Sequence, residues 1–170
     1  MFELIKKTAK LIVRLILGLL SMFGILLCLF LVFWLLIIPI GNEVILKGYV
    51  EELQSYDTGS DYEVVETVGE CGKLFGNGNG MQYLAVALIK SETELAESEL
   101  SMGDGIFVIR ADNEERLRYI LDPYNSGRLE VIKKKLEELS ASGDLAGYYI
   151  LESMQNAPMD SIWTWDLRAH

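Results

Sequence analysis

The residues with the most unusual chemistry in this chain form one glycine-rich segment, Cys71-Gly72-Lys73-Leu74-Phe75-Gly76-Asn77-Gly78-Asn79-Gly80. A phosphate-binding P-loop needs a lysine followed by Ser or Thr, with a helix after the loop. Here Leu74 follows Lys73, and an apolar run typical of a strand follows the glycines, so we exclude a P-loop. The glycines favour a tight hairpin turn. A loop that contacts a ligand or partner through Lys73, Asn77 and Asn79 is the alternative.

Nucleophilic and metal-based catalysis lack their usual residues. The two cysteines cannot pair, because Cys28 lies within a long apolar run and Cys71 lies far outside it. Cys71 has no histidine base near it in the sequence, since the single histidine is His170. We expect a buried Cys71 that acts as a small apolar side chain, with an intermolecular partner as the alternative. No short spacing concentrates carboxylates as metal ligands, so we assign no catalytic residue, no metal site and no cofactor.

Carboxylates near the glycine-rich segment provide the remaining route to an enzyme. A hydrolase could use Asp57, Asp61 or Glu66 together with Lys73. Carboxylates are plentiful throughout this part of the chain, so finding several near one loop carries little information. We leave enzymatic activity open and favour a role without catalysis.

Two tryptophans near residue 165 form a second group of interest. Trp163 and Trp165 alternate with Thr164 and Asp166, which predicts a strand over residues 161–167 with both indoles on one side. Packing of these indoles against helices is the simpler interpretation. An exposed aromatic platform for a ligand is the alternative.

Several short motifs resemble a known but uncharacterised group of proteins. They are Cys71-Gly72-Lys73-Leu74, Gly76-Asn77-Gly78-Asn79-Gly80-Met81, Leu88-Ile89-Lys90-Ser91 and Asp166-Leu167-Arg168-Ala169-His170. The pattern CGKL-x-GNGNGM in particular resembles small membrane-tethered or secreted proteins of gut-type Firmicutes. The resemblance implies an extracytoplasmic bacterial setting and no mechanism. It makes Lys73, Arg168 and His170 the polar residues to test first, although Arg168 can also serve as a salt bridge at a strand end.

The element that must position all these residues is a long apolar segment. Residues 15–38 contain no charge, and a bilayer-spanning helix needs roughly 20 such residues. A cleaved signal peptide has a shorter apolar core of about 7 to 15 residues and a small-residue cleavage site, both absent here. We therefore predict an uncleaved transmembrane signal anchor over 15–40. Four basic residues precede it: Lys6, Lys7, Lys10 and Arg14. They predict a cytoplasmic tail over 1–14.

The charge of the remaining chain excludes some partners. The protein has 15 Lys and Arg and 25 Asp and Glu. Residues 1–40 hold four of the basic and one of the acidic residues, so residues 41–170 carry a formal charge of −13. This part has the size of one domain. Its acidity repels nucleic acid and anionic lipid headgroups, and permits a cationic partner without implying one.

Periodicity predicts an α+β domain in which a mainly antiparallel sheet is covered by two or three helices. A first short helix is expected after an Asn42 cap, with Leu46, Val50 and Leu53 on one face. Turn residues over 56–61 should interrupt regular structure. Further expected strands are 62–71, 81–89, 106–110 and 148–152, the second of them central and covered on both faces. A polar connection over 154–160 is expected to follow.

Two more helices are expected, and one segment is left open. Ser91 and Glu94 fit a capping box, which predicts a helix running to about Leu100. Residues 128–140 show an amphipathic pattern with a cap at Ser126 and a stop at Gly143. Residues 112–121 fit either a hairpin strand or a short helix.

These observations predict a single-pass membrane protein with an extracytoplasmic interaction module over 41–170. We expect this module to bind a protein or a small ligand at the membrane surface, while lipid contacts residues 15–40. The residues expected to contact this protein or ligand partner are Lys73, Asn77, Asn79, Trp163, Trp165, Arg168 and His170. A membrane-anchored immunity or inhibitor protein with an acidic surface is the alternative, beside the hydrolase.

Overall fold

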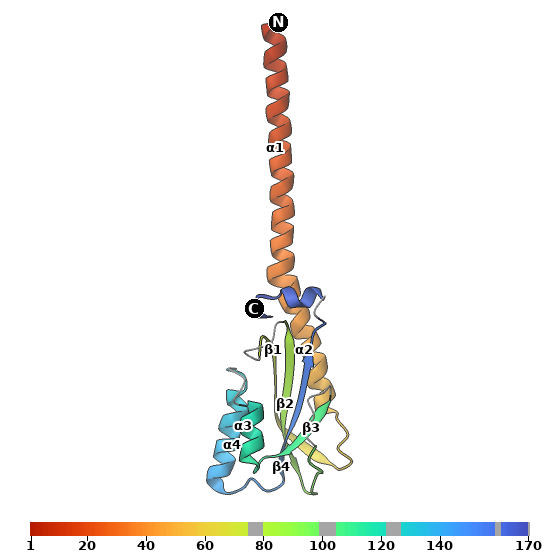
Figure 1. Ribbon diagram of the computed structural model, residues 1–170, viewed down its shortest axis with the longest axis vertical. Helices are drawn as coiled ribbons and strands as arrows, with labels where there is room; N and C mark the ends of the chain where they lie inside the picture. The colour runs from red at the N-terminus through yellow and green to blue at the C-terminus, as the bar shows by residue number, and fades with distance from the viewer. Residues whose placement is uncertain (75–79, 99–104, 122–126, 159–160, 170) are drawn as a thin grey trace.

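The computed structural model describes residues 1–74, 80–98, 105–121, 127–158 and 161–169. A long helix projects from a folded domain, in which an antiparallel sheet lies between helices (Figure 1). The expected α+β class is confirmed.

The long helix is continuous from the amino terminus into the folded domain. It comprises α1 (Phe2–Val32), a wide π turn (Phe33–Ile37) and α2 (Ile38–Gln54). The π turn ends two residues before Pro39, which has no N–H for the carbonyl four residues earlier and whose ring would clash with that carbonyl. Among the described residues, one helix, Lys6–Gln54, is long and apolar enough to cross a membrane. Most large apolar side chains before Ile38 are exposed, as they are on a helix whose partner is lipid.

Four antiparallel strands form the sheet in the order β1-β2-β4-β3. They are β1 (Tyr62–Gly72), β2 (Gln82–Ser91), β3 (Ile106–Arg110) and β4 (Tyr148–Asn156). Each lies where the sequence predicts a strand. β4 extends to Asn156, because residues 154–156 pair with the start of β2. The polar connection expected over 154–160 therefore begins after Asn156.

Helices cover both faces of the sheet. On one face, Leu53 of α2 packs with Ala85, Ile89 and Leu151. On the other face, α3 (Glu114–Leu121) and α4 (Glu130–Ser142) lie side by side (Figure 1). Their apolar residues share a core with β2, β3 and β4, which includes Leu84, Leu88, Ile109, Leu121, Ile132, Leu136 and Ile150. β2 is buried from both sides, as predicted.

The open segment 112–121 contains a helix. Asn113 precedes α3, and its side chain accepts a hydrogen bond from the backbone N–H of Arg116 at 3.3 Å, which satisfies a free donor of the first turn. The amphipathic helix predicted over 128–140 is present as α4, and Gly143 ends it in a left-handed conformation with a φ of 73°. The predicted cap at Ser126 lies outside the described residues.

The helix predicted after Ser91 is wrong over the described residues 92–98. The backbone N–H of Ser91 bonds the carbonyl of Gly147 at 2.8 Å, so it is not available to a capping-box glutamate. Leu95 is buried, and Ser98 exchanges hydrogen bonds with Val108 in β3. Tertiary pairing along the β3 edge therefore overrides the local helix signal.

The strand predicted over 161–167 is also wrong. Ile162–Trp165 and Leu167–Ala169 are short 3-10 helices, and the Ser161 hydroxyl accepts a hydrogen bond from Trp163 N at 3.2 Å. Within the described chain the sheet ends at β1 and β3, so this segment packs on the helix instead. We name residues 161–169 the strap, because they cross α2 where it enters the folded domain (Figure 1).

Candidate functional site

Four parts of the chain meet where α2 leaves the apolar segment: the first turns of α2, the end of β1, the start of β2 and the strap. Their polar side chains form one hydrogen-bonded group, which we name the junction cluster. Its members are Asn42, Glu43, Tyr83, Asp166 and Arg168.

Asn42 is the centre of the junction cluster. The expectation that it caps a helix is wrong, because α2 runs through it without a break and its side chain is fully buried. Its side-chain amide donates to Asp166 Oδ2 at 2.9 Å and to the Trp163 carbonyl at 3.1 Å, while its oxygen accepts from the Tyr83 hydroxyl at 2.6 Å. A buried amide with this many partners fixes the strap, α2 and β2 relative to one another. The expected apolar face is confirmed, since Leu46 is buried nearby.

Arg168 ties the strap to two other parts of the chain. Its guanidinium contacts both carboxylate oxygens of Asp166, at 3.1 Å from Nε and 2.8 Å from Nη2. It also bonds the Glu43 carboxylate and the Pro39 carbonyl on α2. Its own carbonyl accepts from Lys73 N at 2.6 Å, just beyond the end of β1. The planar guanidinium of Arg168 thus joins the strap to α2, and the backbone carbonyl of Arg168 joins the strap to the sheet.

A second arginine shares Glu43. Arg128 Nη1 lies 3.4 Å from Glu43 Oε2 and 3.0 Å from the Gly69 carbonyl of β1. The Cys71 thiol lies 3.8 Å from Glu43 Oε1. Burial raises the pKa of Cys71 to about 11, so at neutral pH it is a neutral thiol. The expected burial of Cys71 is confirmed.

The carboxylates of the junction cluster are held in their charged form. Burial alone would raise the pKa of Glu43, but hydrogen bonds from Arg168 and Arg128 outweigh it and hold that pKa below the ordinary 4.5. Burial opposes ionisation of Asp166 too, yet Arg168 and Asn42 hold its pKa below 3.8. Neighbouring Glu70 behaves oppositely, because burial raises its pKa and its Oε2 is buried without a hydrogen-bond partner among the described residues.

Acid should therefore weaken the junction. A carboxyl whose pKa is lower in the folded state stabilises that state above its unfolded pKa, and this stabilisation is lost as pH falls through the folded pKa. We expect the melting temperature of the full chain in detergent to fall steeply below about pH 4. Glu43→Gln should make the melting temperature less sensitive to acid. Glu70→Gln removes a carboxyl whose pKa is shifted in the opposite direction, so it should leave the acid sensitivity in place. A Glu43→Gln variant as acid-sensitive as the natural chain would contradict this assignment.

The structure brings three of the seven expected contact residues together. Lys73, Trp163 and Arg168 all lie at the junction, where Lys73 is exposed and the other two are half-buried. Trp165 belongs to the first 3-10 helix of the strap rather than to a strand. Asn77, Asn79 and His170 lie outside the described residues.

Sequence reasoning missed four members of the junction cluster: Asn42, Glu43, Tyr83 and Asp166. Their partners are far apart along the chain, and Asn42 and Asp166 are 124 positions apart. One signal was present, because Asn42 and Glu43 are consecutive polar residues directly after a long apolar segment.

The groups considered for hydrolysis do not assemble. Asp61 precedes β1 and Lys73 follows it, and the strand has 11 residues, so they lie roughly 30 Å or more apart. Asp57 is at the same far end as Asp61, where it accepts a hydrogen bond from Gly59 N at 2.8 Å in a turn. Glu66 is in the middle of β1. These four residues therefore form no shared site.

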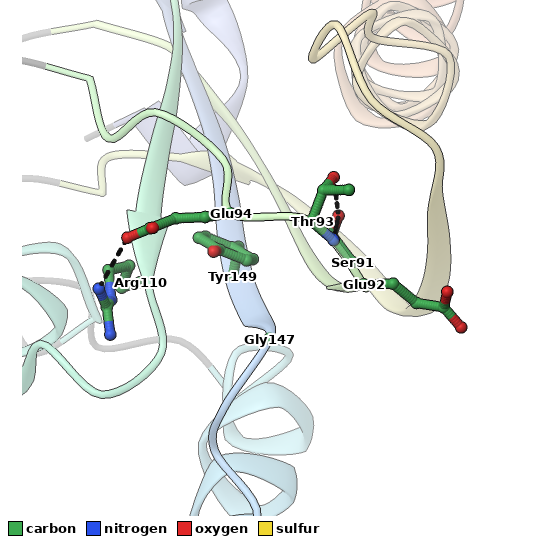
Figure 2. A pocket seen from close by; sticks show the side chains of 7 residues that line it. All are labelled: Ser91, Glu92, Thr93, Glu94, Arg110, Gly147 and Tyr149. Carbon is green, nitrogen blue, oxygen red and sulfur yellow. Dashed lines mark hydrogen bonds and ion pairs between the residues drawn. The ribbon is translucent and has the colours of Figure 1, made fainter.

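An open hollow of about 300 Å³ lies at the other end of the sheet, far from the junction. Its lining includes Ser91, Glu92, Glu94, Arg110 and Tyr149. Glu94 points toward Arg110, which it meets at 3.4 Å, whereas Glu92 points the opposite way (Figure 2). Glu92 is exposed and pairs with no cation in the described part of the chain. We name this site the distal hollow.

The two sites differ in what they can do chemically. The buried donors and acceptors of the junction cluster are satisfied by one another, which is the arrangement of a structural clamp. The distal hollow is open, and among the described residues the Glu92 carboxylate beside it pairs with no cation, so its polar groups are accessible from solvent. Among the described residues, no group of three or more His, Cys, Asp or Glu side chains is placed to hold a metal ion.

Comparison of the chain with models of protein families, with curated proteins and with solved structures gives no match. The resemblance drawn from the glycine-rich motif stays a prediction.

Proposed function

We propose that this protein is a membrane-anchored interaction module, in which the anchor holds a folded domain at the membrane and that domain binds a protein or small ligand. The observation that carries the proposal is the continuity of the long helix with the folded domain. α2 is both the extension of the apolar segment and a core helix of the domain, because Leu46 and Leu53 are buried against the sheet. The domain therefore sits at a fixed height and orientation relative to the anchor, unlike a domain on a flexible linker.

The proposed orientation places the amino terminus in the cytoplasm and the folded domain outside. It is supported by the four basic residues before the apolar segment. An alkaline phosphatase reporter fused after Gly59 is expected to be active. An inactive reporter there, with an active cytoplasmic reporter at the same point, would reverse the orientation.

The distal hollow is the surface that we propose for the partner. It lies at the end of the sheet away from the anchor, and its open rim carries Glu92 and Glu94. The −13 charge of residues 41–170 favours a partner with a basic surface and speeds its approach. This acidity is also what supports the second candidate function, a membrane-anchored inhibitor or immunity protein for a cationic protein.

A photo-crosslinking experiment in native membranes tests the proposal. The full chain carries a photoreactive residue at position 92, or at position 137 on the exposed side of α4 as the control. We expect one discrete adduct from position 92 and none from position 137. The adduct should weaken with Glu94→Gln in the same chain and persist with Glu138→Gln, a matched charge change on α4. Equal labelling from both positions, or none from either, would contradict a partner at the distal hollow.

A further inference from the structure

A second hollow, of about 250 Å³, lies beside the junction cluster. We name it the proximal hollow. Ile45 and Tyr49 of α2 line one side, the Tyr83 ring lines another, and Asn156, Ser161 and Trp163 come from the chain after β4. The Tyr49 and Tyr83 rings are 5.6 Å apart between centroids. The site therefore combines aromatic surfaces with short polar side chains.

The position of the proximal hollow along the helix is set by the anchor. Ile45 and Tyr49 follow the end of the predicted span at residue 40 by five and nine residues. At 1.5 Å per residue they lie about 8 and 14 Å beyond it, for a helix near the bilayer normal. The headgroup layer on each side of the hydrocarbon core is about 5–8 Å thick. Ile45 thus lies at the outer edge of the headgroup layer, and Tyr49 lies several ångströms beyond that edge.

The free polar groups of the proximal hollow are donors. Three groups donate no hydrogen bond within the described part of the chain. They are the Tyr49 hydroxyl, the Ser161 hydroxyl and the side-chain amide nitrogen of Asn156. The Asn156 oxygen is occupied, since it accepts from Gln82 Nε2 at 3.1 Å. Three such donors suit a ligand with acceptor oxygens, such as a phosphodiester.

The rings suit a cation, and the surroundings disfavour net negative charge. An ammonium group over Tyr or Trp is attracted by the ring face. Among the residues that the structure describes, no Asp, Glu, Lys or Arg lines this hollow. The acidic domain around it repels anionic lipids. A group with both a phosphate and an ammonium meets the donors and the rings at once and adds no net charge.

We propose that the proximal hollow binds the headgroup of a zwitterionic phospholipid of the ethanolamine or choline type from the adjacent leaflet. Its volume of about 250 Å³ holds about eight groups the size of water, at about 30 Å³ each, which suits one such headgroup. The lipid's acyl chains stay in the bilayer beside the anchor. This inference rests on the proposed membrane span, and it adds a specific lipid to the general contact of that span with the bilayer.

Native mass spectrometry of the full chain tests the inference. The protein is reconstituted with phosphatidylethanolamine, phosphatidylcholine or phosphatidylglycerol, then released from detergent in the instrument. We expect one retained phosphatidylethanolamine or phosphatidylcholine per chain and weaker retention of phosphatidylglycerol. Equal retention of all three would show only nonspecific annular lipid and would overturn the proposal. Binding of soluble glycerophosphoethanolamine without any lipid preference would overturn a lipid as the source.

Two variants localise the bound headgroup. Tyr49→Phe removes one donor and should weaken retention about threefold to tenfold, the usual effect of one lost hydrogen bond. Asn156→Asp places a negative charge next to the phosphate, on an exposed residue, and should weaken retention at least as much. The controls make the same chemical changes elsewhere, at Tyr148 (Tyr→Phe) and at exposed Gln54 (Gln→Glu). Variants that retain lipid as well as their controls do would overturn the site.

The same preparations separate this inference from the proposed function. Release of the chain from membranes by alkaline carbonate would mean that it does not span them, and the proposed function would fail with the lipid site. A chain that stays in the membrane and crosslinks from position 92, yet shows no lipid preference, would overturn the lipid site alone.

Discussion

Asp166→Ala is expected to detach the strap from α2 and to lower the free energy of unfolding by about 2–3 kcal/mol. The side chain of Asp166 is 1% exposed, and its carboxylate joins Asn42 to Arg168. Its removal leaves a buried amide without its acceptor and an arginine without its main partner. Breaking a buried pair costs about 3–5 kcal/mol. We expect less because the Arg168 side chain is 36% exposed, so water partly replaces the lost carboxylate.

The chain contains a matched control for this prediction. Arg110 and Asp112 form the same two-point contact at the same spacing, with distances of 3.0 and 2.7 Å, but on the surface. Asp112→Ala should therefore leave the thermal unfolding curve of the full chain in detergent nearly unchanged. Equal effects of the two substitutions would mean that the junction cluster contributes no more than a surface ion pair.

Gly41→Ala is expected to lower the free energy of unfolding by up to about 2 kcal/mol, although alanine is the better helix former. The Trp163 ring lies directly on the backbone of α2 at Gly41, so a Cβ there would come within 2.7 Å of Trp163 Cη2. The ring must move away, and forced overpacking of this kind costs about 1–3 kcal/mol. The gain in helix propensity, about 1 kcal/mol, offsets only part of that cost.

Gly48→Ala is the control within the same helix. A Cβ at Gly48 meets nothing within 4 Å, so this variant should be more stable than the natural chain by up to about 1 kcal/mol. Tryptophan fluorescence should change with Gly41→Ala, which moves Trp163, and stay unchanged with Gly48→Ala. Stabilisation by both substitutions would show that the strap does not rest on the helix at Gly41.

Much of the fold was predictable because its signals are local. The strands at 62–71 and 106–110 show β-rich composition, and the helix over 128–140 shows a clear apolar stripe ending at Gly143. Two of the wrong predictions concern segments whose local pattern was overridden by distant contacts. Residues after Ser91 pair along β3 instead of forming a helix, and the strap packs on α2 instead of joining the sheet.

The candidate sites were less predictable for the same reason. Arg168 and Trp163 stood out by their type and motif, but nothing near them in the sequence indicated Asn42 or Glu43 as partners. An asparagine next to an apolar segment has the local appearance of a helix cap. Its burial becomes evident only when the strap, more than a hundred residues later, is placed against it.

The π turn at Phe33–Ile37 sets the rotation of α1 about the helix axis relative to the sheet. Each residue of an α-helix advances the chain by about 100° around the axis, and a π turn contains about one extra residue. Below this turn, Asn42 and Leu46 prevent α2 from rotating against the domain. Each face of α1 therefore has a fixed direction relative to the folded domain. A neighbouring helix that packs against one face of α1 therefore always lies on the same side of the folded domain.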